Sequence, residues 1–344
     1  MTEHKRTIIE ISPKTIFWAL GVGLVLTALY FVIDIIAILI FAIIIASAIE
    51  PILRFAEGKR VPRIISLIVI YLVFLVFFAA FLYIIFPLLL DQFRDFTENY
   101  PTYFGKLEEA AGTVTFLPGF SANIHNLLVQ LTEQIPNFTS LIQYASQIFG
   151  GILSLLVVVV VSFYLALFPR ALDDFLKSIM PVQFESYALD LWTRAQRKMG
   201  LWLQAQIVLS LIMGIVVFIG LWALGVKYAF LVAIVATIFE IVPFVGPIVT
   251  GAVATLFAVS QSPTLGLWTL IFFVVAQQLE NHILVPIFSK RLIGLNPVAV
   301  IIALLIGAKL GGILGVLLAV PLLAVADEFF EDISKRKVAH IDIL

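Results

Sequence analysis

The chain has 344 residues, of which 62% are hydrophobic and only 12% are charged, and its formal net charge is −1. This composition excludes an ordinary water-soluble domain and predicts an all-α polytopic membrane protein. A nucleic-acid partner is excluded because no long basic run is present, and the absence of cysteine with four scattered histidines argues against thiolate chemistry and a metal site.

The N-terminal half predicts three membrane spans. Residues 15–55 are apolar over far more than the roughly 20 residues that one crossing needs, so we expect two spans that meet at Asp34. The loop that follows carries basic residues such as Arg60 and Arg63, which the positive-inside rule places in the cytoplasm together with the N-terminus. A third span over 64–89 then leads outside.

Residues 91–149 are polar and predict the main extracytoplasmic segment, in which FSANIHNLLVQLTEQI has the spacing of an amphipathic helix. A fourth span over 150–168 returns the chain to the cytoplasm. Aromatic and charged residues over 169–200 indicate interfacial helices there. Residues 1–168 are therefore expected to form a scaffold domain.

A fifth span over 201–224 precedes two apolar segments, 228–259 and 297–326, that are both broken near the centre. Each is about 30 residues long, so a straight helix would be roughly 45 Å long, against a hydrocarbon core of roughly 30 Å. We predict two re-entrant helical hairpins with about six full spans; eight plain spans are the alternative. The expected tips are Pro243, Gly246 and Pro247 in the first hairpin and Gly311, Gly312 and Gly315 in the second.

Spans 201–224 and 265–288 each precede one hairpin, which suggests an inverted-topology repeat. A shift of 69 residues places Glu240 on Lys309 and Gly246 on Gly315. In a straight helix, Gly307, Gly311 and Gly315 would instead form a close-packing ridge. The hairpin interpretation predicts a transport domain over residues 201–330, a midplane binding site and a cytoplasmic tail over 331–344.

Glu240 is a candidate for substrate binding or ion coupling, because a carboxylate in hydrocarbon must be paired, hydrated or protonated. It would bind a proton, a cation or a polar substrate. The structural alternative is an ion pair or cap that secures the hairpin tip, and Lys309 is the expected partner. Lys309 is similarly placed before the second tip and is a further candidate for substrate binding or ion coupling, although it could also extend its ammonium group toward water.

The second candidate cluster is AQQLENH at 276–282. On an α-helix, Gln277 shares a face with Glu280 and Asn281, and this face could hydrogen-bond a hydroxylated ligand. The alternative is hydrogen bonding between helices of the bundle. His282, which shares a face with Gln278, is expected to be a bundle residue rather than a metal ligand.

Three segments together resemble the C-terminal signatures of the AI-2E family of transporters, also called the autoinducer-2 exporter family. They are FEIVPFVGPIVTG at 239–251, QQLENHILVPIFSKRLIGLNPVAV at 277–300 and GAKLGGILGVLLAVPLLAVADEFFED at 307–332. The motif residues that correspond are Pro243, Gly246 and Pro247, then Gln277, Glu280 and Asn281, then Gly311, Gly312 and Gly315.

The resemblance implies a bacterial or archaeal inner-membrane protein that assembles into a homo-oligomer, with a pentamer as one form. Some members of the family are described as exporters of the quorum-sensing signal autoinducer-2 and others as sodium or lithium/proton antiporters. The charge pattern predicts that both termini are cytoplasmic.

We therefore expect a secondary transporter that exports a small polar signal molecule, bound between the hairpin tips and the 277–282 face, with Thr250 as a further hydroxyl partner. A monovalent cation/proton antiporter is the alternative. No ATP-binding loop and no cofactor motif is present. A non-transporting membrane scaffold is a third class, and an intramembrane enzyme is disfavoured because no nucleophile or metal constellation is found.

Overall fold

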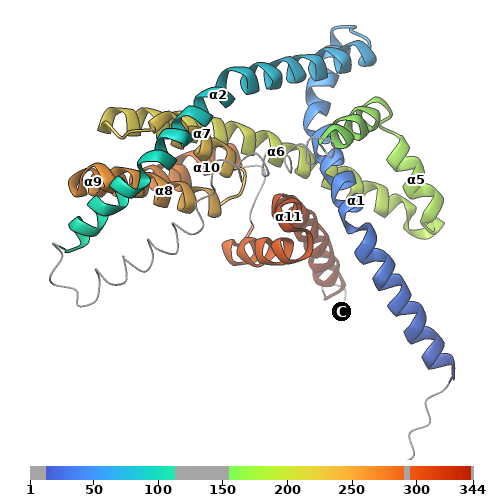
Figure 1. The fold of residues 1–344 in the computed structure, drawn as a ribbon. Coiled ribbons are helices and arrows are strands. Elements are labelled where there is room, and N and C mark those ends of the chain that lie inside the picture. The colour runs from blue at the N-terminus through green and yellow to red at the C-terminus, as the bar shows by residue number, and fades with distance from the viewer. Residues whose placement is uncertain (1–12, 113–154, 290–294, 342–344) are drawn as a thin grey trace, which may run out of the picture.

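The computed structural model describes residues 13–112, 155–289 and 295–341, and within these ranges the chain is helical without strands (Figure 1). This confirms the predicted all-α class. The helices are α1 Pro13–Gly58, α2 Arg63–Gly112, an unlabelled helix Leu155–Leu167, α5 Ala171–Ile179, α6 Val182–Leu224, α7 Ala229–Phe239, α8 Val245–Gln261, α9 Pro263–Leu279, a π-helical segment Glu280–Leu284, α10 Val285–Ser289 and α11 Pro297–Ile341.

Four of the described helical stretches are long and apolar enough to cross a membrane. A fifth crossing is possible by length and composition if Leu155–Leu167 and α5, which meet at an angle of 84°, are taken as one broken span. The protein is therefore a multi-pass membrane protein. The four stretches are Ile35–Gly58, Arg63–Gln92, Val182–Leu224 and Pro263–Ile287.

The prediction of two spans within 15–55 is wrong, because α1 continues without interruption from Pro13 to Gly58. Neither glycine nor proline occurs between Leu24 and Glu50, so the i to i−4 hydrogen-bond ladder meets no breaker there. One aspartate, Asp34, lowers helix propensity by only a fraction of a kcal/mol, roughly 0.7 at most, and does not turn the chain.

Other predicted boundaries fall inside helices. Helix α2 extends to Gly112, so the first part of the predicted extracytoplasmic segment continues the helix of the third span. Helix α6 runs without a break through residue 200, where an interfacial helix was expected to give way to a span. The amphipathic helix predicted at FSANIHNLLVQLTEQI lies outside the described residues.

The first broken segment folds back on itself as a helical hairpin. Helices α7 and α8 are joined by a turn over 240–244, and their small apolar residues, such as Ala233 and Ala258, share one buried cluster. Gly246 makes the turn tight, because a Cβ atom there would lie 2.3 Å from the carbonyl oxygen of Phe239. A side chain at residue 246 would therefore force the turn to shift.

The second broken segment reverses direction within α11. Gly311 and Gly312 leave the helical conformation, and Gly312 has φ 54° and ψ −133°, a region that only glycine adopts readily. The two arms then touch at Gly307 and Gly315, where a Cβ on Gly315 would lie 2.0 Å from the carbonyl oxygen of Gly307. Both segments are thus hairpins in shape, while their re-entrant insertion into a membrane stays a prediction.

Helix α6 holds the two hairpins together. It packs against α7 on one side and against α11 and α1 elsewhere along its length (Figure 1). Trp202 of α6 is buried with Val300 and Leu304 of α11, and Val242 from the turn of the first hairpin packs on this cluster. The turn of the first hairpin therefore rests against the arms of the second hairpin.

Candidate functional site

Glu240 lies in the turn of the first hairpin and is 2% exposed. Its backbone N–H donates to the carbonyl oxygen of Ala236, which continues the hydrogen bonding of α7 by one residue. Its own carbonyl oxygen accepts a 2.5 Å hydrogen bond from Nε2 of Gln206, a buried residue of α6. The turn is thus fixed to α6, and the Glu240 side chain is held in the interior.

Glu280 is 8% exposed and begins the π-helical segment that follows α9. The carbonyl oxygen of Glu280 accepts from the N–H of Val285, five residues later, so the helix is widened here by one extra residue. Gln277 Nε2 donates to Glu280 Oε2 over 2.9 Å. A widened turn of this kind is frequent at functional sites, and this one coincides with the polar cluster.

The buried carboxyl groups of Glu240 and Glu280 lie close enough to each other to interact. Two carboxylates carry only acceptor atoms and repel each other, so a hydrogen bond between them requires one proton. The pair brings together two residues that are 40 positions apart in the sequence. Chemically it can hold a proton or, once deprotonated, offer several oxygen ligands to a cation.

Further polar groups lie near the hairpin on α6. Gln206, Ser210 and Gly214 are spaced by four residues and so share one face of α6. This face meets the first hairpin, because Gln206 bonds the turn and a Cβ on Gly214 would lie 1.9 Å from Thr237 Oγ1. Within the described part of the chain, the buried Ser210 hydroxyl has no hydrogen-bond partner.

Thr250 does not offer a free hydroxyl, since its Oγ1 donates to the carbonyl oxygen of Gly246 over 2.8 Å. Asn281 and His282 are exposed. Gln277 Nε2 is 3.5 Å from Asn281 Oδ1, and the Nδ1 atom of His282 is 3.0 Å from the carbonyl oxygen of Gln278. The polar cluster is therefore divided: Glu280 belongs to the buried pair and is hydrogen-bonded by Gln277, whereas Asn281 and His282 are exposed.

The ion pair between Glu240 and Lys309, the structural alternative for these residues, is not formed. Lys309 is exposed beside the bend of α11, and no ion pair between described residues includes it. The reason is geometric, because the turn of the first hairpin faces the arms of the second rather than its bend. Glu280 takes the place opposite Glu240.

The predicted tip residues have different positions. Pro243 lies in the first turn, Gly246 and Pro247 begin α8, and Gly311 and Gly312 form the bend of α11. A Cβ added to Gly311 or Gly312 would have no neighbour within 4 Å. Gly315 lies beyond the bend, where the two arms of α11 touch.

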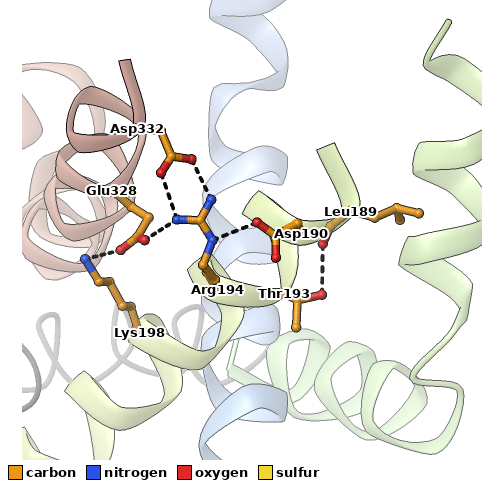
Figure 2. A network of polar contacts seen from close by, with 7 residues as sticks. All are labelled: Leu189, Asp190, Thr193, Arg194, Lys198, Glu328 and Asp332. Atoms are coloured by element: carbon orange, nitrogen blue, oxygen red, sulfur yellow. Dashed lines mark hydrogen bonds and ion pairs between the residues drawn. The ribbon is translucent and has the colours of Figure 1, made fainter. Parts of the chain in front are cut away.

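An ion-pair cluster connects α6 to the end of α11, and sequence reasoning missed it (Figure 2). Arg194 binds Asp190 of its own helix and both Glu328 and Asp332 of α11, while Lys198 binds Glu328. The hydrogen bond from Lys198 and that from Arg194 lower the pKa of Glu328. The i, i+4 spacing of charges on both helices was the signal that could have revealed this cluster.

These features define a class: a polytopic membrane protein in which a buried polar site lies at the turn of a broken helical segment, as in secondary transporters. The sequence matches the profile described as AI-2E family transporter over residues 21–335. The chain belongs to this family, and it is a membrane transport protein by that membership.

Curated relatives agree with this assignment. "Putative transport protein YueF" of Bacillus subtilis (strain 168) is 26% identical over 351 aligned residues, which cover 94% of this chain and 95% of the relative. "Putative transport protein YrrI" of the same organism is 26% identical and covers 88% of this chain and 87% of its own length. A "Putative transport protein" of Thermotoga maritima is 22% identical, with 84% and 85% covered.

Proposed function

We propose that this protein is a secondary transporter whose site is built on the buried Glu240–Glu280 pair, and that its substrate is a small polar molecule of the autoinducer-2 type. The family name suggests this class of substrate. The observation that carries the proposal is the pair itself: two neighbouring carboxyl groups are buried inside an apolar bundle, and ionisable groups buried in a membrane protein typically mark functional sites.

Substrate exchange would be coupled to the shared proton. The protonated pair is internally satisfied and needs no ligand. A hydroxylated substrate could replace the carboxyl–carboxyl hydrogen bond and use the Gln277 amide and the Ser210 hydroxyl as further partners. Access would alternate by movement of the first hairpin relative to α6, which the hydrogen bond from Gln206 to the Glu240 carbonyl oxygen restrains.

Sodium or lithium/proton antiport is a second candidate, and the same pair favours it. Loss of the shared proton leaves two negative charges within a short distance, and a monovalent cation would neutralise part of this charge. Protons and cations would then compete for one site, which is the requirement for exchange.

Flux measurements in proteoliposomes distinguish the candidates. Purified protein, the Glu240→Gln variant and the Glu280→Gln variant would each be tested for movement of autoinducer-2 and for sodium- or lithium-dependent pH change. Asp327→Asn is the matched control, because Asp327 is an exposed carboxylate of α11. We expect autoinducer-2 flux that falls at least about tenfold in both glutamine variants and is unchanged in the control.

Cation-dependent pH change without autoinducer-2 flux would instead support antiport. If both glutamine variants transport as well as the unmodified protein, the site assignment is wrong. If neither flux is observed in correctly folded protein, the scaffold interpretation replaces both candidates.

A further inference from the structure

A cavity, separate from the Glu240–Glu280 site, lies between α1, the helix Leu155–Leu167, α5 and α6. Its volume is about 660 Å³, which is within the range of small-molecule sites. It lies at the end of the bundle that the basic residues predict to be cytoplasmic, beside the short helix α5. None of the residues of α5 is buried, as expected for a helix that lies at a membrane surface.

The cavity is closed toward the Glu240–Glu280 site. Helices α1 and α6 touch at Gly200, where a Cβ atom would lie 2.5 Å from the carbonyl oxygen of Ser47. One turn further along α6, Gln204 Nε2 donates to the carbonyl oxygen of Ala48 over 2.5 Å. These two contacts lie between the cavity and Gln206, so the cavity is a separate recess rather than the entrance of a path to Glu240.

The charged groups of the cavity fall into two sets. Glu50 forms ion pairs with Arg54 and with Arg63, so its charge is already matched inside the protein. Asp173 of α5 and Arg197 of α6 also line the cavity, and neither has an ion-pair partner among residues 13–112, 155–289 and 295–341. One negative and one positive group are therefore available to a ligand.

The uncharged part of the lining is mostly apolar and includes Ile43, Leu165, Leu172 and Leu201, together with the polar Ser47, Thr193 and Gln196. A ligand that suits this cavity must combine an apolar part with a head that carries both a cation and an anion. Its cation would bind Asp173, and its anion would bind the guanidinium group of Arg197. Within a membrane, zwitterionic phospholipids have this chemistry, and an ethanolamine head group also carries the N–H donors that can hydrogen-bond Asp173.

We propose that this cavity binds the head group of a zwitterionic phospholipid, with the phosphate on Arg197, the ammonium on Asp173 and the acyl chains along the apolar wall. An anionic lipid is disfavoured, because its head group lacks a cation and would place its negative charge near Asp173. The lipid would connect α1 and α5 to α6 at the membrane surface.

Native mass spectrometry of the full chain in detergent tests this proposal. The protein would be titrated with phosphatidylethanolamine, with phosphatidylglycerol and with soluble glycerophosphoethanolamine. We expect phosphatidylethanolamine to bind at least about tenfold more tightly than either of the other two. Asp173→Asn should remove the preference over phosphatidylglycerol, and Arg197→Gln should weaken the binding of phosphatidylethanolamine by about tenfold. Asp174→Asn and Arg170→Gln are matched controls, since these exposed neighbours do not line the cavity and should bind like the unmodified chain.

A charge reversal keeps the experiment decisive if a neutral variant folds poorly. Asp173→Lys makes both free charges of the cavity positive, and we expect preference to change to phosphatidylglycerol by about tenfold or more. Equal binding of the two lipids by the unmodified chain, an Asp173→Asn variant that keeps the preference, or an Arg197→Gln variant that binds phosphatidylethanolamine as tightly as the unmodified chain would overturn the proposal. Equally tight binding of the soluble head group would also overturn it and would identify a site for a water-soluble phosphoamine.

Discussion

Gly246→Ala should disturb transport while leaving the protein folded. The added Cβ would lie 2.3 Å from the Phe239 carbonyl oxygen and 2.9 Å from the Glu240 nitrogen, and both are backbone atoms that cannot rotate away. A normal C···O contact is about 3.3–3.6 Å, so the turn must move by roughly 1 Å. That movement displaces Glu240 relative to Glu280.

The energetic consequences differ for the fold and for the site. Overpacking costs about 1–3 kcal/mol, and alanine recovers up to about 1 kcal/mol through its helix propensity, so net destabilisation stays below about 3 kcal/mol. A misplacement of about 1 Å can reduce the rate of a precisely aligned site by a factor of about 10². We therefore expect Gly246→Ala to lower transport by about 10- to 100-fold with a small loss of thermal stability.

The assay is flux into proteoliposomes normalised to reconstituted protein, with thermal unfolding in detergent measured in parallel. Gly311→Ala is the matched control, because Gly311 also lies at a hairpin bend but its φ of −135° is allowed for alanine and no atom lies within 4 Å of the added Cβ. Normal transport by a folded Gly246→Ala variant would refute the reasoning. An equal loss in Gly311→Ala would show that the close contact is not the cause.

Two further predictions concern the ion-pair cluster of Figure 2. Arg194→Gln should lower the free energy of unfolding by up to about 1 kcal/mol for each partly exposed ion pair that is lost. Arg194→Lys should restore only part of this stability, because an ammonium group cannot reproduce the two parallel hydrogen bonds that the guanidinium group makes to Asp332. Equal stability of all three proteins in chemical denaturation would contradict this prediction. The pKa of Glu328 is lowered in the folded state, so its ionised side chain contributes to the free energy of unfolding at pH values above its unfolded-state pKa of about 4.3. This contribution is lost as the pH falls through the lower folded-state pKa. The stability difference between the unmodified protein and Glu328→Gln should therefore be constant near neutral pH and shrink in acid; a difference that grows in acid would reverse the assigned sign.

Much of the fold could be predicted from segment lengths and helix breakers. The two interrupted apolar segments do fold back, because their prolines and glycines lie where the chain reverses. The single helix α1 was not predicted, since apolar length alone cannot distinguish two short helices from one long helix. A turn needs a local breaker, and Asp34 is not one.

The candidate site was predicted in its residues but not in its pairing. Glu240, Gln277 and Glu280 were selected because polar groups are costly in an apolar segment, and the structure brings these three residues together. Their arrangement depends on the direction in which the first hairpin turns and on the extra residue of the π-helical segment. Neither property has a local sequence signal, and an assumption of regular α-helical spacing placed Asn281 on the same face as Glu280.

The structure also clarifies what the two hairpins share. The shift of 69 residues aligns Gly246 with Gly315, and both are contact glycines just after a reversal: Gly246 against Phe239 and Gly315 against Gly307. The close backbone contact at a glycine just after the chain reversal therefore occurs in both hairpins. The aligned charged residues differ in environment, because Glu240 is buried and Lys309 is exposed. A repeat that keeps its packing glycines but buries a charge in only one copy is expected to separate two roles. Under the proposed function, the first hairpin alone would handle the proton or the substrate.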